Sequence, residues 1–285
     1  MRESADPSFR RIYAGMRALD LARQPAWFRP LLVRSRRLQG MTGFDHWSRA
    51  WEYPWAVIEA GLAPPGTTAA RGGAAEGART GGATSPLRLL DVGGGGSPFG
   101  PWLATRGFEV HIADPSLDQG RDFAWDPARS LYRNARTVAK RAVFALLGVP
   151  SLWGLPGGTG ADAPVRGAAD DGSLRYHAFG AQALGFPDAH FDRVFCLSVI
   201  EHIPHDLWPA CVREFERVLR PGGRLVITMD METHEADARL PMRLVEACSL
   251  RLLGDPRYPA PIDPAEAQRR HPGNWYETMG LVWEK

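Results

Sequence analysis

A run of glycines and the two aspartates around it are the residues best suited to chemistry. Asp91 lies in the apolar segment 87–92, and the glycines 93–96 follow that segment directly. Successive glycines let the backbone turn sharply after a buried strand and let a ligand approach the main chain closely. Asp114 ends a second apolar segment, 19 residues after Gly95. A carboxylate at that spacing can accept hydrogen bonds from both hydroxyls of a ribose, so the pattern predicts a nucleoside-containing ligand.

This glycine run differs from the one that binds a nicotinamide dinucleotide. In the dinucleotide motif a third glycine packs a helix against a strand, and Pro98 stands at that position here. The carboxylate of Asp91 would repel a pyrophosphate, whereas it would attract an ammonium or sulfonium cation. The residues therefore favour a cationic nucleoside ligand over a dinucleotide.

Four segments, in the correct order, resemble the motifs of class I S-adenosylmethionine-dependent methyltransferases. The first two are 89–96, which contains the glycine run, and 103–116, which ends in Ala-Asp-Pro-Ser. The segment 181–194 is similar to the family's run A-x-x-L-P-F-x-D-x-x-F-D-x-V, and 201–223 to its fourth strand, helix and fifth strand. The resemblance implies an enzyme that transfers the methyl group of S-adenosylmethionine to an oxygen or nitrogen of a small metabolite.

The resemblance also implies where the cofactor binds. The three glycines 93–95 would cradle its methionine part, with Asp91 near the amino group, and Asp114 would hold the ribose. The residues that the resemblance assigns to cofactor binding are Asp91, Gly93, Gly94, Gly95, Asp114, Pro115, Ser116, Ala181, Gln182 and Leu197.

At the adenine end the chain departs from the family's pattern. By resemblance, Pro115 and Ser116 would lie beside the ring, and the backbone N–H of Ala181 would meet a ring nitrogen. The family usually places an aspartate before this alanine to bind the adenine amino group, but here Gly180 stands there. Gln182 is the candidate substitute for that contact.

His202 is the candidate catalytic residue. Methyl transfer depends mainly on alignment, and a base is needed only when the acceptor must lose a proton. His202 follows the strand predicted over 191–197, at the edge where ligands lie in such sheets, and its ordinary pKa suits neutral pH. The alternative is that Glu201 and His202 only brace this turn. Relatives with a metal site carry a glutamate where this chain has Ser198, so no metal is expected.

Strands that alternate with helices predict an α/β fold with a doubly wound, Rossmann-like, mostly parallel sheet. The resemblance adds helices on both faces and an antiparallel last strand. The predicted strands, besides 191–197, cover 87–92, 108–113 and 224–229.

Local signals place two helices beside these strands. One is predicted over 205–219 with Leu207 on its apolar face, and another begins after Ser97, whose side chain is expected to cap it. His177 and His205 are expected to be ordinary surface histidines.

The remaining length is expected to form accessory segments. Residues 1–62 are predicted to be a helical lid, 63–86 a flexible linker, and 87–285 the methyltransferase domain. Within that domain, 117–175 is far longer than a crossover helix needs and predicts a helical cap that suits a bulky or apolar acceptor.

Aromatic residues recur in the predicted lid. Trp47, Trp51 and Trp55 are spaced every four residues, although Pro54 would kink a helix there. Either this stripe packs in the core, or the lid contributes Trp51 or Tyr53 to the cofactor site.

Residues 1–40 are rich in arginine and contain an apolar stripe. They would form either a solvated helix or an amphipathic helix in peripheral contact with an anionic membrane. The stripe consists of Phe9, Ile12, Tyr13 and Met16.

Composition excludes several classes of protein. The 34 basic residues (Lys and Arg) and 32 acidic residues nearly balance, and no basic-aromatic module is visible, so no nucleic-acid partner is expected. The start lacks an apolar signal, no run is long enough to span a membrane, and the three cysteines are isolated, so a cytoplasmic protein is expected. A protein or membrane-lipid acceptor, and a non-catalytic regulatory protein of the same fold, remain alternatives. The oligomeric state stays open.

Overall fold

The structure is a computed structural model that describes residues 7–35, 49–62, 85–115, 117, 173–232, 240–254 and 276–285. Ser116 and Trp47 lie outside these ranges, as do most of the predicted linker and most of the predicted cap. The boundaries of lid, linker and cap therefore stay predictions.

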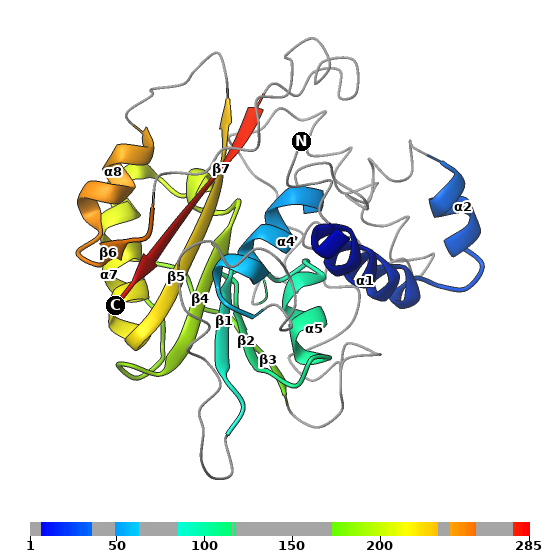
Figure 1. Ribbon diagram of the computed structural model, residues 1–285, viewed down its shortest axis with the longest axis horizontal. Coiled ribbons are helices and arrows are strands. Elements are labelled where there is room, and N and C mark those ends of the chain that lie inside the picture. The colour runs from blue at the N-terminus through cyan, green and yellow to red at the C-terminus, as the bar shows by residue number, and fades with distance from the viewer. Residues whose placement is uncertain are drawn as a thin grey trace.

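Among the described residues, seven strands form one sheet in the order β3-β2-β1-β4-β5-β7-β6 (Figure 1). β1 to β5 pair in parallel, and β7 runs antiparallel to both β5 and β6. The predicted α/β sheet with an antiparallel last strand is confirmed. The strands are β1 (Arg88–Val92), β2 (Glu109–Ala113), β3 (Leu174–His177), β4 (Phe191–Leu197), β5 (Leu219–Glu232), β6 (Arg251–Leu252) and β7 (Tyr276–Glu284).

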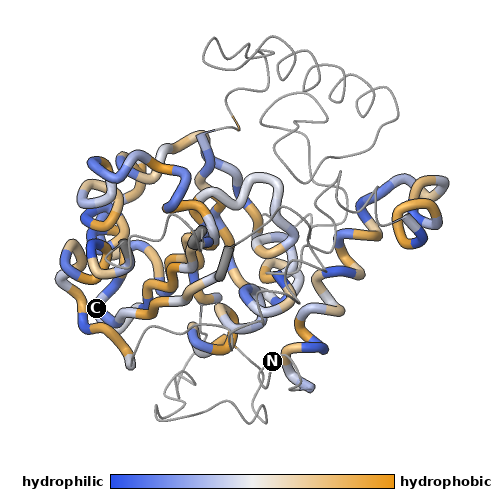
Figure 2. Tube along the Cα trace, turned by 90° about the horizontal axis from the view of Figure 1, so that it is seen from above, coloured by the Kyte–Doolittle hydropathy of each residue, from blue (hydrophilic) through white to orange (hydrophobic). Residues whose placement is uncertain are grey.

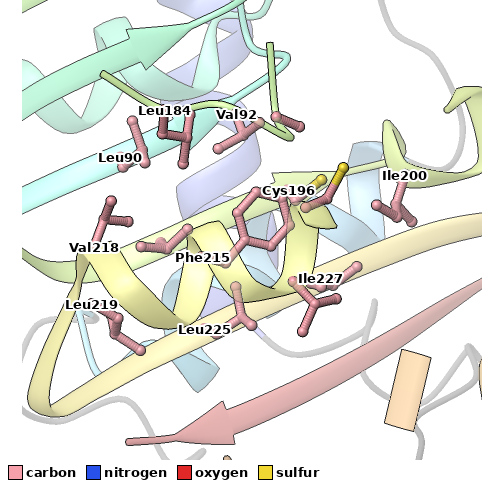
Figure 3. Close-up of a cluster of buried hydrophobic side chains, with 14 of the residues drawn as sticks. Leu90, Val92, Leu184, Cys196, Ile200, Phe215, Val218, Leu219, Leu225 and Ile227 are labelled. Carbon is pink, nitrogen blue, oxygen red and sulfur yellow. The ribbon is translucent and has the colours of Figure 1, made fainter. Parts of the chain in front are cut away.

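Helices cover both faces of the sheet, as predicted. Successive side chains of a strand point to opposite faces, so Phe195 and Val226 pack with α1, α4 and α5, whereas Cys196 and Ile227 pack with α7 and α8. Figure 3 shows Phe215 of α7 among the side chains on the second face. The helices are α1 (Pro7–Arg23), α2 (Arg29–Arg34), α4 (Arg49–Glu59), α5 (Phe99–Ala104), α7 (Trp208–Val218) and α8 (Leu240–Ala247), with the short 3₁₀ helices η3 (Ile200–His202) and η4 (His205–Leu207).

The helix predicted over 205–219 is shorter in the structure. α7 begins at Trp208, and the preceding residues form η4. Trp208 is buried and its indole N–H donates to the Ile200 carbonyl oxygen at 2.9 Å, whereas Leu207 is left 36% exposed. The placement of Leu207 on the apolar face was therefore wrong.

Two further boundaries differ from the predictions. β5 begins at Leu219 rather than at the predicted residue 224, because Leu219 already pairs with Phe191 of β4. The register then shifts, and the residues of the glycine turn lie between Leu219 and the next pair, Arg193 with Arg224. α5 begins at Phe99 with Pro98 as its N-cap residue, although the Ser97 hydroxyl oxygen still accepts the Phe99 N–H at 3.0 Å. Local propensity places an element correctly but not its ends.

The amphipathic N-terminal segment forms α1, and its apolar stripe packs on the body of the protein. Phe9, Ile12 and Met16 are buried against side chains of α4 and α5. Figure 2 shows hydrophobic and hydrophilic residues alternating along this helix. These three residues of the stripe therefore belong to the core of this chain, whereas the fourth, Tyr13, is partly buried and lines a cavity. Within the part of the chain that the structure describes, no helix is both long and apolar enough to cross a bilayer.

Candidate functional site

A cavity of about 470 Å³ lies where β1, β2 and β4 end, between the glycine loop and helices α1 and α4. This volume is within the range of small-molecule sites, roughly 300–1,000 Å³. The predicted residues on its wall are Asp91, Gly93, Gly94, Asp114, Pro115, Ala181, Gln182, Leu197 and His202. Gly95 adjoins the wall through its backbone N–H, which donates to Asp114 Oδ2 at 3.0 Å.

The glycine loop has no room for side chains. Gly93 has a φ of +79°, a conformation that only glycine adopts at little cost, and a Cβ there would lie 2.6 Å from Val199 Cγ1. A Cβ on Gly94 would overlap the Asp91 carboxylate, and one on Gly95 would lie 2.7 Å from Asp114 Oδ2. The loop thus packs directly on both aspartates and fixes where they point.

Asp91 is buried in a state that suits a cation. Its side chain is 3% exposed, and its Oδ2 atom finds no hydrogen-bond partner among the described residues. Burial and the charge of Asp114 raise the pKa of Asp91 to about 8. A buried, unpaired carboxyl oxygen is unfavourable. A ligand ammonium group would relieve that cost, so the residues present fit the amino-acid end of S-adenosylmethionine.

Substitution of Gly94 by alanine is expected to abolish most ligand binding while the fold persists. The added methyl group would displace the Asp91 carboxylate, and a displaced carboxylate cannot meet an ammonium group. We expect S-adenosylhomocysteine affinity to fall at least about tenfold, the scale of one charge-assisted hydrogen bond. Titration calorimetry checks the affinity and circular dichroism checks the fold; equal affinity in the folded variant would contradict the assigned role of the loop.

Helix α4 contributes a buried ionic network beside the cavity. Glu52 is fully buried, and its carboxylate accepts hydrogen bonds from Ser198 Oγ at 2.7 Å, from Thr228 Oγ1 and from Arg49. Burial alone would lower the pKa of Arg49, but Glu52 and other surrounding groups outweigh it and raise that pKa. Arg49 therefore stays cationic on the cavity wall.

The network also holds a strained residue. Ser198 follows β4 with a φ of +49°, which is uncommon for a residue with a side chain. Its N–H donates to the Thr228 carbonyl oxygen and to Thr228 Oγ1, each at 3.0 Å. This sharp turn carries the chain into η3, which places His202 on the cavity wall. Strain of this kind tends to gather at functional sites.

Of the two lid aromatics proposed for the cofactor site, Tyr53 lines the cavity. Its hydroxyl group hydrogen-bonds Ser97 Oγ at 2.9 Å, and burial raises its pKa to about 12. Trp51 stacks on Trp55 at 5.2 Å in the core instead. Pro54 lies inside α4, so this part of the stripe is helical.

We expect Tyr53→Phe to lower the free energy of unfolding by about 1 kcal/mol, the usual net value of one neutral hydrogen bond. The change removes the bond that ties α4 to the glycine loop and leaves the ring in place. Denaturant unfolding measures the difference, with the exposed Asp206→Asn as a control that should remain at the wild-type value. A Tyr53→Phe variant more stable than wild type would contradict a stabilising role for the hydrogen bond between Tyr53 and Ser97.

On the cavity wall after β3, the side chain of Gln182 lies over Gly180. A Cβ on Gly180 would be 2.8 Å from Gln182 Oε1, so the glutamine side chain occupies the space beside this glycine. Both residues line the cavity. The role of Gln182 as a substitute for the family's aspartate at position 180 stays a prediction.

His177 is not the surface histidine that was expected. It is partly buried and stacks on His111 at 5.0 Å, and the two rings share a hydrogen bond of 3.0 Å. Burial lowers the pKa of His111 to about 4. The pairing of β2 with β3 brings these residues together, which no local pattern could indicate. His205 is exposed, as expected.

The sequence reasoning missed polar residues that α1 and α4 contribute to the site. Arg17 and Asp20 of α1 and Arg49 of α4 line the cavity. A signal existed for α1: Arg17 and Asp20 follow Tyr13 at helical spacing, on the side that the apolar stripe already marks. No such signal existed for Arg49, because its position depends on how α4 packs.

Comparison with known proteins gives similarity to methyltransferases. Residues 160–227 match a family model described as a methyltransferase domain. The 27-O-demethylrifamycin SV methyltransferase of Amycolatopsis mediterranei (strain S699) is 49% identical over 47 residues. Those residues are 16% of this chain and 16% of that relative, so the match spans about a sixth of the relative's length.

Two of the similar solved structures are also methyltransferases. The 1,6-didemethyltoxoflavin-N1-methyltransferase of Burkholderia thailandensis is 16% identical with a TM-score of 0.41, over 70% of this chain and 71% of that one. The geranyl diphosphate C-methyltransferase of Streptomyces coelicolor A3(2) is 13% identical with a TM-score of 0.39, over 72% and 74%. At this level the similarity says nothing about the acceptor.

Proposed function

We propose that this chain is a class I S-adenosylmethionine-dependent methyltransferase, which methylates an oxygen or nitrogen of a small metabolite. The observation that carries the proposal is the buried Asp91 carboxylate, which has an oxygen without a described partner and lies against the glycine loop. Asp114, directly after the neighbouring strand β2, would bind the ribose, and its carboxylate accepts the Gly95 N–H.

The residues of this chain bind and orient rather than react. Asp91 would hold the amino group of the cofactor, Asp114 the ribose hydroxyls, and Pro115, Ala181 and Gln182 the adenine. When bound, S-adenosylmethionine supplies a methyl group already activated by its sulfonium. Alignment of the acceptor with that methyl group then provides most of the acceleration.

The rest of the cavity wall is available for the acceptor. Met16, Val199 and Ile203 give it an apolar character, which favours a bulky or apolar metabolite. His202 is exposed on the same wall and would accept a proton from a hydroxyl acceptor as the methyl group is transferred. We propose that α1 and α4 form the lid that closes this space.

Binding of S-adenosylhomocysteine to the intact protein tests the proposal. Titration calorimetry should detect binding of S-adenosylmethionine and of S-adenosylhomocysteine, and failure of both to bind would overturn the methyltransferase assignment. Release of S-adenosylhomocysteine is then followed with a panel of apolar hydroxyl and amine acceptors. Tight binding without turnover on any of them would favour a regulatory protein of this fold.

The role of His202 is tested with the hydroxyl acceptor that turns over. His202→Asn should lower kcat at least about 100-fold, the scale of general base catalysis, and leave S-adenosylhomocysteine affinity unchanged. An unchanged kcat would leave His202 as a brace of the turn after β4.

A further inference from the structure

Among the polar side chains of the cavity wall to which the proposed function gives no role, one is a buried carboxyl group. Asp20 of α1 lines the cavity and is only 4% exposed. Its Oδ1 atom has no hydrogen-bond partner in the part of the chain that the structure describes. Burial raises its pKa to about 6, with the charge of Arg23 opposing the shift. A carboxylate in this state is costly to bury, and a donor group from a ligand would relieve the cost.

The course of α1 indicates which end of the cavity Asp20 faces. α1 packs on α4 and on α5, and a Cβ on Gly15, near the middle of α1, would lie 2.8 Å from Trp102 Nε1 of α5. Arg23, near the end of α1, acts electrostatically on Tyr176 of β3. β3 lies at one edge of the described sheet, opposite the edge formed by β6, and pairs with β2. Asp20, which precedes Arg23 by less than one turn, therefore lies toward the β2–β3 side of the cavity.

The ribose site lies on that same side. Asp114 and Pro115 follow β2, whereas Arg49 and His202 belong to α4 and η3, beside β4 and β5. An adenosine group presents two kinds of donor, the hydroxyls of the ribose and the amino group of the adenine. A buried carboxylate that faces this group forms a charge-assisted hydrogen bond with either of them.

We propose that Asp20 is a further cofactor-binding residue, which accepts a hydrogen bond from an O–H or N–H donor at the adenosine end of S-adenosylmethionine. The inference rests on the proposed function. It makes α1 part of the binding site rather than only a cover, so the cofactor itself holds the lid helix in place.

The experiment compares wild type with Asp20→Asn, and uses the exposed Asp206→Asn as a matched control. Titration calorimetry with S-adenosylhomocysteine at pH 7.5 measures affinity, and thermal unfolding without ligand measures stability. We expect Asp20→Asn to bind about tenfold more weakly, because a charge-assisted bond becomes a neutral one. We also expect its Tm to rise, since the substitution removes a buried charge whose burial outweighs the attraction of Arg23. The control should match wild type in both respects.

For Asp20→Asn we expect the affinity for S-adenosylhomocysteine to fall and the Tm to rise. These opposite changes distinguish a residue that binds the ligand from one that only supports the fold. A residue that only supports α1 would lower the Tm when replaced, and a lower Tm with unchanged affinity would overturn the proposal. So would unchanged affinity alone. If wild type itself fails to bind S-adenosylhomocysteine, the proposed function falls as well, which is a different result.

S-inosylhomocysteine, in which an oxygen replaces the adenine amino group, identifies the donor. If Asp20 meets the amino group, the difference between wild type and Asp20→Asn disappears with this analogue. If Asp20 meets a ribose hydroxyl, the tenfold difference persists. Either result supports the proposal. It would be overturned if wild type and Asp20→Asn differed more in affinity for S-inosylhomocysteine than they do for S-adenosylhomocysteine.

Discussion

Replacement of Asp114 by alanine is expected to weaken S-adenosylhomocysteine binding by at least about 100-fold, because two hydrogen bonds to a charged acceptor are lost at about 1.5–3 kcal/mol each. The carboxylate is held in place by the Gly95 N–H at 3.0 Å. The substitution therefore removes the carboxylate that would bind the ribose hydroxyls. It also leaves the Gly95 N–H without its acceptor. Titration calorimetry on the purified variant measures the loss.

The control for Asp114→Ala is an alanine at Asp188, whose side chain is 80% exposed on the loop before β4. Asp188→Ala should bind S-adenosylhomocysteine as wild type does. If Asp114→Ala also keeps the wild-type affinity, the ribose does not bind at the end of β2, and the cofactor pose proposed above is wrong.

Binding of S-adenosylhomocysteine is expected to release close to one proton at pH 7. The pKa of Asp91 is raised to about 8 in the free protein, so only about a tenth of the molecules carry the ionised form at pH 7. The ammonium group of the ligand favours the carboxylate and drives off the proton. Calorimetry in two buffers of different ionisation enthalpy counts the protons released.

The same linkage predicts that affinity rises with pH. Between pH 6 and 7 the ionised fraction of Asp91 grows about tenfold, and the affinity should grow by about the same factor. In Asp91→Asn the proton release and this part of the slope should both disappear. An equal slope in the two proteins would show that Asp91 does not meet the ammonium group.

Asp91 has the opposite effect on the stability of the free protein. Its pKa in the folded state lies above the ordinary value of 3.8, so ionisation favours the unfolded chain. Its contribution to stability is present below about pH 4 and is lost as the pH rises through about 8. A buried carboxylate that destabilises the free protein and binds the ligand fits a functional rather than a structural residue.

The sequence by itself determined the parts of this protein that depend on neighbouring residues. Alternating strands and helices predicted the sheet, and the glycine run with Asp91 and Asp114 predicted the centre of the cavity. These signals are readable because a strand, a turn and the carboxylate at a strand's end lie within one short stretch of chain. Parallel pairing then brings the ends of neighbouring strands to one edge of the sheet.

Only the tertiary structure decided which other side chains complete the site. Ser198 and Thr228 reach Glu52 across 146 and 176 residues of chain, and Asp20 faces the cavity because α1 packs across α4 and α5. Contacts at such separations depend on how helices dock on a sheet. Docking is determined by the summed packing of many apolar side chains, and no spacing within α1 or α4 specifies it.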